Sequence, residues 1–264
     1  MKRLVEWPGW ILGRSLAALR LVVVLGSMTL LVGLGLALIR LKMVGQPFAF
    51  RIRTGWCRFA LWVMGVRIHC SGAPDLSPGT LYVGNHRSFI DPLIAFSYIP
   101  KGYAVGKQEV ASYPVVHAGA KLSGVVYVDR QDSQSRRTTK QVIADLLRAG
   151  MSVLIFPEAT ISIAPQALPF RKGSFEAAVE AERPVVAFAL ELGDPERDFW
   201  YPEGLFGLYY QCFSKWRTRV YLHFFPPERG TVGETLCKQV EGRINGKLLE
   251  FQLQHWKGSP RSVA

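Results

Sequence analysis

The side chains best placed to do acid–base chemistry in this sequence are a histidine and an aspartate five residues apart, His86 and Asp91. They lie in the stretch 82–92, YVGNHRSFIDP, where a short apolar run leads directly into the histidine. Imidazole is the usual general base near neutral pH, and it works best when a second group accepts a hydrogen bond from its other ring nitrogen. A tight turn would fold Asp91 back onto His86. The spacing therefore favours a pair that deprotonates a hydroxyl group, although the residue types alone also fit a turn followed by a helix start with Pro92 at its first position.

Such a pair needs no nucleophile from the protein if the hydroxyl of the substrate attacks. The sequence is consistent with this, because it contains no G-x-S-x-G motif and no cysteine in a comparable position. The four cysteines have neither metal-ligand nor disulfide-framework spacing, which is typical of thiols in a reducing compartment. The five histidines are scattered without ligand spacing, so we expect no metal.

The histidine segment belongs to a pattern of short apolar runs that alternate with helical stretches from residue 67 onward. This alternation predicts an α/β fold with a mixed, mostly parallel sheet flanked by helices. The predicted strands are Arg67–Cys70, Thr80–Val83, Tyr103–Val105, Val125–Val128, Ser152–Phe156, Val185–Leu190 and Arg219–Phe225. The predicted helices are Asp91–Tyr98, Pro114–Leu122, Gln134–Ala149, Gly173–Glu182 and Glu234–Gln254. Residues 194–217 are rich in aromatic side chains and are predicted to form a loop that covers the core or touches lipid.

Three polar clusters come directly after predicted strands: His86, the pair Asp129 and Arg130, and the pair Pro157 and Glu158. In open α/β sheets, ligands bind beyond the carboxyl ends of the strands. We therefore expect these clusters to face one cleft.

The amino-terminal segment is strongly basic and apolar. Ten of the 32 Lys and Arg residues, but only one of the 20 acidic residues, lie within residues 1–67, so this segment carries most of the net charge of +12. The uncharged stretch Leu21–Ile39 is long enough to cross a bilayer core about 30 Å thick. Residues 48–64 mix aromatic side chains with arginines, which is typical of an interfacial helix whose arginines bind lipid phosphates. We predict an amino-terminal membrane-embedded helix pair in residues 1–66, and a main domain in residues 67–264 on the cytoplasmic side.

Two other interpretations of the apolar stretch are weaker. A signal peptide is disfavoured because Arg40-Leu41-Lys42 follows where the small residues of a cleavage site belong. A buried helix of a soluble core is seldom apolar all round. Basic residues flank both ends of the stretch, so the sequence leaves open whether it crosses the bilayer or only enters it.

Two further stretches extend the pattern around the histidine: Gly124–Arg130, GVVYVDR, and Phe156–Thr160, FPEAT. Together the three stretches resemble the signature blocks of the glycerolipid acyltransferase family, the PlsC-like 1-acyl-sn-glycerol-3-phosphate (lysophosphatidic acid) acyltransferase type. That family shows N-H-x-x-x-x-D, then G-x-x-F-[IV]-x-R, then F-P-E-G-T, in this order. Further matches are Lys107-Gln108-Glu109 with Pro114 and Gly119, the segment Phe170–Phe175, and Pro184-Val185-Val186. The resemblance covers about residues 66–190.

The resemblance implies a membrane-bound O-acyltransferase that moves a fatty acyl group from acyl-CoA or acyl carrier protein to the sn-2 hydroxyl of 1-acyl-glycerol-3-phosphate. The product would be phosphatidic acid, an intermediate of phospholipid biosynthesis. His86 is implied as the base and Asp91 as its partner. The substrate-binding residues implied by the matching positions are Asn85, Lys107, Arg130, Glu158, Thr160 and Arg171. Among these, Asn85 would hold the turn, and Glu158 and Thr160 would shape the acceptor site. Lys107 would serve the oxyanion or the phosphate of the donor, and Arg130 and Arg171 would bind the phosphate of the acceptor.

The same resemblance implies no cofactor beyond the acyl donor. The implied partners are the lyso-lipid acceptor, acyl-CoA or acyl carrier protein, and an anionic membrane surface, with the main domain at the cytoplasmic face of a bacterial inner membrane. No nucleic acid is expected, because the basic residues flank apolar helices.

Two positions depart from the family pattern. Ala159 replaces the glycine of F-P-E-G-T, where glycine allows a special backbone angle or a close approach. Ile161 stands where many members have an arginine. An acceptor such as a lyso-amino-acid lipid therefore stays an alternative, as does a thioesterase that uses the same pair on water. A non-enzymatic membrane anchor or a nucleic-acid binder would explain the charge but not the ordered blocks.

Overall fold

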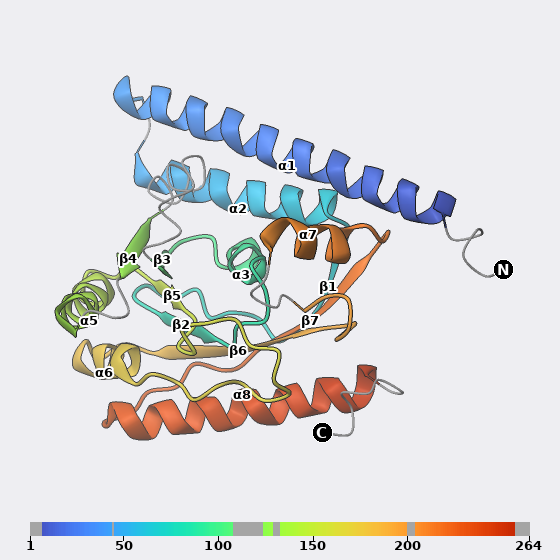
Figure 1. The fold of residues 1–264 in the computed structure, drawn as a ribbon. Coiled ribbons are helices and arrows are strands. Elements are labelled where there is room, and N and C mark those ends of the chain that lie inside the picture. The colour runs from blue at the N-terminus through green and yellow to red at the C-terminus, as the bar shows by residue number, and fades with distance from the viewer. Residues whose placement is uncertain (1–6, 44, 108–123, 129–132, 200–203, 257–264) are drawn as a thin grey trace.

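The chain folds around a seven-stranded sheet with helices on both faces (Figure 1). The computed structural model describes residues 7–43, 45–107, 124–128, 133–199 and 204–256. The strands are β1 (Val66–Ser71), β2 (Leu81–Gly84), β3 (Tyr103–Lys107), β4 (Val125–Val128), β5 (Val153–Ile155), β6 (Val185–Leu192) and β7 (Thr218–Phe224). The helices are α1 (Trp7–Arg40), α2 (Gln46–Val63), α3 (Asp91–Tyr98), α5 (Ser133–Arg148), α6 (Gly173–Glu180), α7 (Leu205–Phe213) and α8 (Gly233–His255).

The order of the strands places the polar segments at one edge of the sheet. The order is β1-β7-β6-β2-β5-β3-β4, and the described pairs are parallel except for β6 and β7. Because β1 and β7 run against the other five strands, their amino-terminal ends lie at the same edge as the carboxyl ends of those five. We call this the carboxyl edge. His86 follows β2 and Glu158 follows β5, so both lie there.

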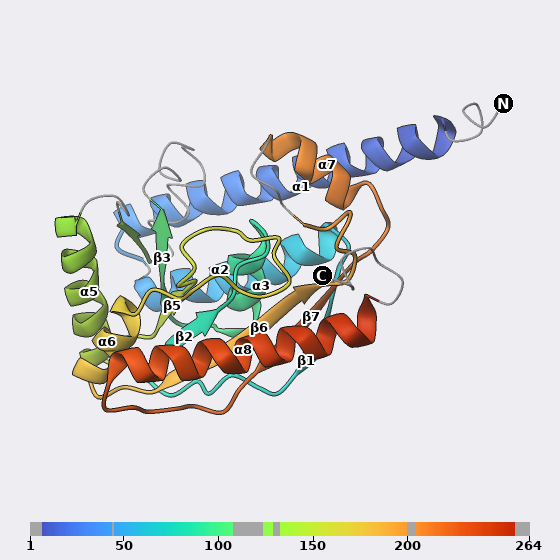
Figure 2. The same ribbon diagram turned by 60° about the horizontal axis from the view of Figure 1, so that its bottom comes forward.

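Two hydrophobic clusters, one on each face of the sheet, hold the helices in place. Helices α2 and α3 pack together on one face, and α6 and α8 pack together on the other. Figure 2 shows α8 lying along its face of the sheet. Strand β6 is buried at all eight positions, because helices cover it on both sides. An apolar run of this kind is typical of a central strand.

The predicted fold is confirmed. All seven predicted strands are present, with ends within two residues of the prediction, and four of the five predicted helices are present as α3, α5, α6 and α8. The fifth, Pro114–Leu122, lies outside the described residues.

The predicted loop over residues 194–217 is wrong for α7. The side chains of Tyr209, Cys212 and Phe213 are buried, and this spacing places them on one face of a helix that packs against α1. Aromatic residues and glycine have modest helix propensities, so the local sequence gave a weak signal. Burial against α1 outweighs that propensity.

The amino-terminal helix packs on the main domain. Residues Trp10–Leu38 of α1 are long and apolar enough to cross a membrane, by length and composition alone. Within this stretch, however, Arg20 is only 6% exposed. Its guanidinium donates hydrogen bonds to carbonyl oxygens at the end of α7 and just after it, at 2.8 Å to Phe213, 2.7 Å to Lys215 and 3.0 Å to Trp216. The amino-terminal half of α1 is therefore fastened to the turn between α7 and β7.

The second helix, α2, differs from the prediction in the direction of its arginines. Arg53 is buried, donates a hydrogen bond to the carbonyl oxygen of Gly102 at 2.7 Å, and lies 3.6 Å from the centre of the Phe96 ring. Nε of Arg58 donates to the carbonyl oxygen of Ser97 at 2.8 Å. The prediction that these arginines bind lipid phosphates is therefore wrong for Arg53. The physical reason is that α3 packs against the face of α2 that carries Arg53, which places the guanidinium on the Phe96 ring and within reach of the Gly102 carbonyl oxygen.

Candidate active site

The tight turn predicted between His86 and Asp91 is present, and one carboxylate organises it. Asp91 is the first residue of α3 and is fully buried. Its Oδ2 accepts hydrogen bonds from the backbone N–H groups of Arg87 at 2.5 Å and Ser88 at 2.7 Å, and it lies 2.8 Å from Nδ1 of His86. Its Oδ1 accepts a hydrogen bond from the Ser88 hydroxyl. The turn therefore fixes the carboxylate, and the carboxylate fixes the imidazole ring.

The contact with Asp91 defines what the imidazole can do. An ionised carboxylate only accepts hydrogen bonds, so Nδ1 of His86 carries the ring hydrogen and donates a hydrogen bond to Asp91. Nε2 then keeps its lone pair, and the His86 side chain is 17% exposed, so a substrate hydroxyl can reach the ring. The pair can remove a proton from that hydroxyl while the carboxylate stabilises the imidazolium that forms.

An aromatic column lies beneath the histidine. The ring of His86 stacks on Phe156 with centroids 4.5 Å apart and an angle of 20° between the planes. Phe156 in turn meets Phe188 of β6 edge-on at 6.0 Å. Gly84 at the end of β2 makes room for this column, because a Cβ at that position would lie 2.2 Å from the Phe188 ring. The rings of Phe156 and Phe188 therefore restrict the orientation of the His86 imidazole ring.

A second carboxylate, Glu158, supports the same turn. Strands β2 and β5 are neighbours, and the pairing of Val83 with Ile155 sets the segments that follow them side by side. Oε1 of Glu158 accepts a hydrogen bond from the backbone N–H of His86 at 2.6 Å, and Oε2 accepts one from the backbone N–H of Leu168 at 2.7 Å. Burial raises the pKa of Glu158, and these two hydrogen bonds oppose the rise. Glu158 thus links the histidine turn to the loop that follows β5.

Asn85 lies inside the sheet. Its Nδ2 donates to the carbonyl oxygen of Leu190 at 2.8 Å, and its Oδ1 accepts from the N–H of Leu190 at 2.8 Å. This amide extends the pairing of β2 with β6 beyond Gly84. The side chain is fully buried, so Asn85 positions the turn, and its predicted contact with substrate does not fit this place in the structure.

A buried ion pair beside the turn was missed in the sequence. Arg87 is 1% exposed and Glu191 is fully buried, and their Nη2 and Oε2 atoms are 3.0 Å apart. Oε2 also accepts a hydrogen bond from Gln252 of α8 at 2.9 Å. The guanidinium further donates to the carbonyl oxygens of Ser162, Ala164 and Pro165. An acid in the apolar run VVAFALEL of β6 was the signal that could have revealed this pair.

The loop after β5 carries three of the predicted substrate-binding residues, Glu158, Thr160 and Arg171. Thr160 and Arg171 are exposed, and the backbone N–H of Arg171 bonds to the carbonyl oxygen of Pro157 at 3.1 Å. Ala159 has a φ of 63°, which is the left-handed region that favours glycine. Ile161, the other departure from the family pattern, is half-buried and packs against the hydrophobic cluster.

Two predicted site residues remain, Lys107 and Arg130. Lys107 ends β3 at the carboxyl edge, but its side chain is not among those described, and Arg130 lies outside the described residues. Their predicted roles stay predictions, as do those of Thr160 and Arg171. No group of three or more His, Cys, Asp or Glu side chains in the described parts of the chain could hold a metal ion.

The part of the chain that carries this geometry is similar to known proteins. Residues 67–191 match the family model described as Acyltransferase. The 1-acyl-sn-glycerol-3-phosphate acyltransferase of Cocos nucifera is 30% identical over 161 residues, which cover 58% of this chain and 52% of that protein. The lyso-ornithine lipid O-acyltransferase of Rhodobacter capsulatus is 30% identical over 176 residues, which cover 64% of this chain and 62% of that protein. The chain spans about half the length of the first curated relatives it matches.

A solved structure shows the same fold. The crystal structure of the 1-acyl-sn-glycerophosphate (LPA) acyltransferase, PlsC, from Thermotoga maritima has a TM-score of 0.66 and 19% sequence identity, and the match covers 96% of this chain and 98% of that one. The segment matched by the family model contains the histidine turn, the Glu158 support and the buried pair of Arg87 with Glu191. The ordered sequence blocks, the fold and the matched segment agree, and residues 67–191 of this chain form an acyltransferase domain.

Proposed function

We propose that this protein transfers a fatty acyl group from a thioester to the sn-2 hydroxyl of 1-acyl-glycerol-3-phosphate, giving phosphatidic acid. The observation that carries the proposal is the contact of 2.8 Å between His86 Nδ1 and the buried Asp91 carboxylate, on a ring that is partly open to solvent. The relatives named as 1-acyl-sn-glycerol-3-phosphate acyltransferases support this choice of acceptor. The thioester is acyl-CoA or the acylated form of acyl carrier protein.

The reaction needs one base and no covalent enzyme intermediate. Nε2 of His86 takes the proton from the acceptor hydroxyl as its oxygen attacks the carbonyl carbon of the thioester. Asp91 stabilises the imidazolium while the tetrahedral intermediate exists. The carbon–sulfur bond then breaks, and the imidazolium returns the proton to the departing thiolate. The products are the new ester and a free thiol, and the enzyme is unchanged.

The residues that bind the substrates are proposed from their places at the carboxyl edge for Lys107, Thr160 and Arg171, and from the sequence blocks alone for Arg130. Lys107 ends β3 there and is assigned to the oxyanion or to the phosphate of the donor. Arg171 and Thr160 are exposed on the loop that begins beside His86, and Arg171 is assigned, with Arg130, to the phosphate of the acceptor. No cofactor or metal enters this mechanism.

The protein is proposed to work at a membrane. Helix α1 carries the apolar stretch Trp10–Leu38, and many of its large apolar side chains are exposed. A lyso-lipid keeps its acyl chain in the bilayer, so an enzyme that acts on it gains from lying beside the headgroups. We place the catalytic domain on the cytoplasmic side, at the inner membrane of a bacterium.

A lyso-amino-acid lipid is the second candidate acceptor. The Rhodobacter capsulatus relative, named as a lyso-ornithine lipid O-acyltransferase, matches a larger share of both chains than the Cocos nucifera relative. Ile161, which stands where many family members have an arginine, packs against the hydrophobic cluster. If the acceptor has no phosphate, Arg171→Gln should leave its KM unchanged, whereas with 1-acyl-glycerol-3-phosphate the KM should rise about tenfold or more.

The direct test follows thiol release from acyl-CoA by purified protein in detergent, with and without 1-acyl-glycerol-3-phosphate. We expect release that depends on the acceptor and falls at least about 100-fold in His86→Ala. The matched control is His69→Ala, since His69 is exposed on β1 and its ring stacks on Tyr221, far along the sheet from β2.

Each result has a defined meaning. Release without acceptor that disappears in His86→Ala would identify a thioesterase that uses the same pair. Activity with the lyso-ornithine lipid alone would favour the second candidate. Full activity of His86→Ala would refute the proposed base.

A further inference from the structure

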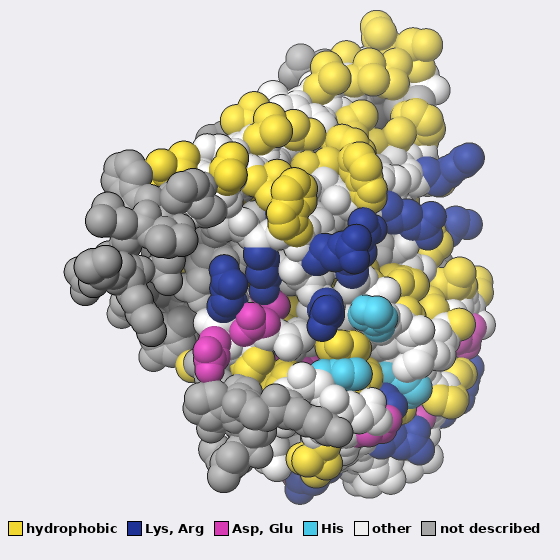
Figure 3. Space-filling model, turned by 90° about the vertical axis from the view of Figure 1, so that its right-hand side faces the viewer, with side chains coloured by type: hydrophobic (Ala, Val, Ile, Leu, Met, Phe, Trp, Pro, Cys, Tyr) yellow, Lys and Arg dark blue, Asp and Glu magenta, His cyan; other side chains and the backbone are white. Residues whose placement is uncertain are grey.

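An amphipathic groove lies at the carboxyl edge, away from the histidine turn, where α1 and α2 meet the amino-terminal ends of β1 and β7. Its volume is about 560 Å³, within the range of ligand sites. Apolar side chains of Leu19, Val23, Phe59 and Trp62 line it, and Arg67 and Arg217 line it as well. Figure 3 shows the same division on this side of the molecule, with hydrophobic side chains above a band of Lys and Arg.

The groove is held in shape by buried contacts. The three hydrogen bonds of Arg20 to the carbonyl oxygens of Phe213, Lys215 and Trp216 fasten the turn that carries Arg217 to α1. Gly65 lets the start of β1 come close to this turn, because a Cβ there would lie 2.5 Å from both the Arg20 guanidinium and the carbonyl oxygen of Trp216. Its φ of 75° also requires glycine. The site therefore exists before any ligand binds.

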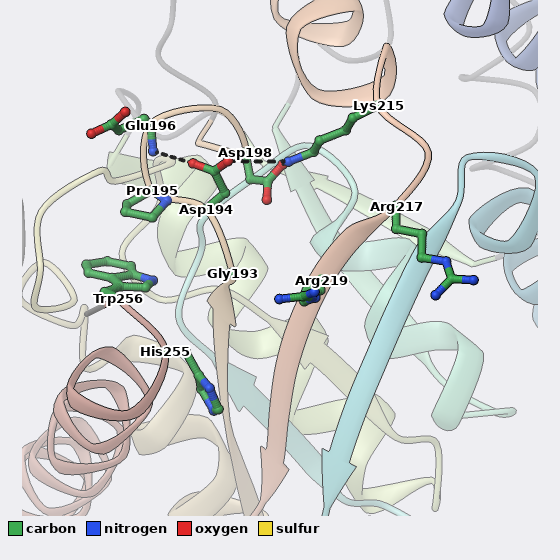
Figure 4. A pocket seen from close by; sticks show the side chains of 10 residues that line it. All are labelled: Gly193, Asp194, Pro195, Glu196, Asp198, Lys215, Arg217, Arg219, His255 and Trp256. Atoms are coloured by element: carbon green, nitrogen blue, oxygen red, sulfur yellow. Dashed lines mark hydrogen bonds and ion pairs between the residues drawn. The ribbon is translucent and has the colours of Figure 1, made fainter. Parts of the chain in front are cut away.

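The charges that face the groove are available for a ligand. Arg67 and Arg217 are exposed, and no described residue forms an ion pair or a side-chain hydrogen bond with either guanidinium. The neighbouring Lys215 differs, because its Nζ is paired with the Asp198 carboxylate. Figure 4 draws a neighbouring pocket, which Arg217 also lines. In it Lys215 points at Asp198, while Arg217 points away from Asp194 and Asp198. Two uncompensated arginines beside an apolar channel match a ligand that has a phosphate at one end and a hydrocarbon chain at the other.

We infer that this groove binds one anionic phospholipid, with its phosphate on Arg67 and Arg217 and one acyl chain along Leu19, Val23, Phe59 and Trp62. Trp62 is 65% exposed and Trp216 is 80% exposed, and indole rings favour the interface between lipid and water. The amino-terminal ends of β1 and β7 lie at the edge where β2 delivers His86. A lipid phosphate held there places the carboxyl edge of the sheet at the level of the lipid headgroups. This lipid is a bound component of the membrane, distinct from the acceptor.

The test measures binding of phosphatidylglycerol to the full chain, by native mass spectrometry from detergent and by flotation with phosphatidylcholine vesicles that contain or lack phosphatidylglycerol. The charge variant is Arg67→Gln with Arg217→Gln. Each arginine near a membrane surface contributes about 1 kcal/mol, so the pair should weaken retention about 30-fold. The matched control, Lys101→Gln with Lys238→Gln, removes two exposed lysines elsewhere and should change retention less than about threefold.

A second variant tests the apolar half of the groove. Leu19 is 62% exposed, so Leu19→Gln should fold normally, keep the charge, and still weaken phosphatidylglycerol retention several-fold. Equal losses in the arginine and lysine variants would show general charge attraction and overturn the inference. Unchanged retention in Leu19→Gln, together with competition by inorganic phosphate, would identify a phosphate site without a lipid chain and would also overturn it. His86→Ala should bind phosphatidylglycerol as the wild type does, so this result is independent of the proposed reaction.

Discussion

Replacing Asp91 by asparagine separates the charge of this residue from its role in shaping the turn. Oδ2 receives the two backbone N–H groups of Arg87 and Ser88 and faces Nδ1 of His86. Only the carbonyl oxygen of an asparagine can take that position, because an NH₂ group there would face donors. The NH₂ group then lies toward the Ser88 hydroxyl, which can rotate to accept. The ring orientation of His86 should survive, and only the negative charge is lost.

The cost of losing that charge can be bounded. A hydrogen bond to a charged group contributes about 1.5–3 kcal/mol, against about 0.5–1.5 kcal/mol for a neutral one, which gives a difference of about 1–1.5 kcal/mol. Two unit charges about 4 Å apart near a protein surface interact by about 4 kcal/mol. At about 1.4 kcal/mol per tenfold, we expect kcat to fall between about tenfold and about 1,000-fold. His86→Ala should cost at least as much, since it removes the proposed base itself.

The assay is initial rates of thiol release at saturating acceptor, with thermal unfolding measured on the same samples. The matched control is Ser88→Ala, which removes one donor to Oδ1 and should lower kcat less than about tenfold. Wild-type kcat in Asp91→Asn would refute the view that the carboxylate stabilises an imidazolium. A large loss of Tm would instead assign the lost activity to an unfolded turn.

Three further predictions concern stability and are checked by chemical or thermal unfolding. Ala159→Gly should raise the free energy of unfolding by about 0.5–1 kcal/mol. An alanine in the left-handed region costs about 1–2 kcal/mol, and the greater freedom of glycine in the unfolded chain offsets part of that gain. The control Ala181→Gly, at a right-handed backbone position, should lower the free energy of unfolding. Glu191→Gln should destabilise by about 3–5 kcal/mol, since it leaves the buried Arg87 guanidinium without its charge partner; a loss under 1 kcal/mol would contradict this. Burial raises the pKa of Asp198 to about 6, above its usual unfolded value of about 3.9, so its contribution to stability is full below about pH 4 and is lost as the pH rises through 6. Asp198→Asn should remove that part of the pH dependence, and an unchanged slope between pH 4 and 6 would exclude Asp198 as its source.

The predicted elements succeeded where local pattern and burial agree. The strand Val185–Leu190 was visible as an apolar run because β6 is covered on both faces. The helix Asp91–Tyr98 was visible because Pro92 follows an acid at its first position. Helix α7 was missed because its stability comes from contact with α1, a segment about 190 residues earlier in the chain. A local pattern cannot report a partner at that distance.

The predictions for the site also succeeded where the interacting residues are close in sequence and failed where they are far apart. His86 and Asp91 are close in sequence, so their spacing alone predicted the turn, and the structure places them in contact. Glu158 was named as a substrate-binding residue, yet its carboxylate binds the backbone of His86 and Leu168. Asn85 was named likewise, and its other predicted role, holding the turn, is the one that fits its two hydrogen bonds to Leu190 inside the sheet. In both cases the partner is a backbone group of another strand or loop, which no side-chain pattern reveals.

The sequence by itself determined the class of chemistry and the class of fold, because short-range spacing and hydrophobic periodicity are properties of the local chain. It also showed that Ala159 stands where the family pattern F-P-E-G-T has a glycine. Only the tertiary structure decided which side chains support the histidine, that Arg53 and Arg87 are buried, and that β1 and β7 bring Arg67 and Arg217 to the carboxyl edge of the sheet. These features depend on strand order and on contacts between segments far apart in the chain, and such contacts are set by the packing of the whole molecule.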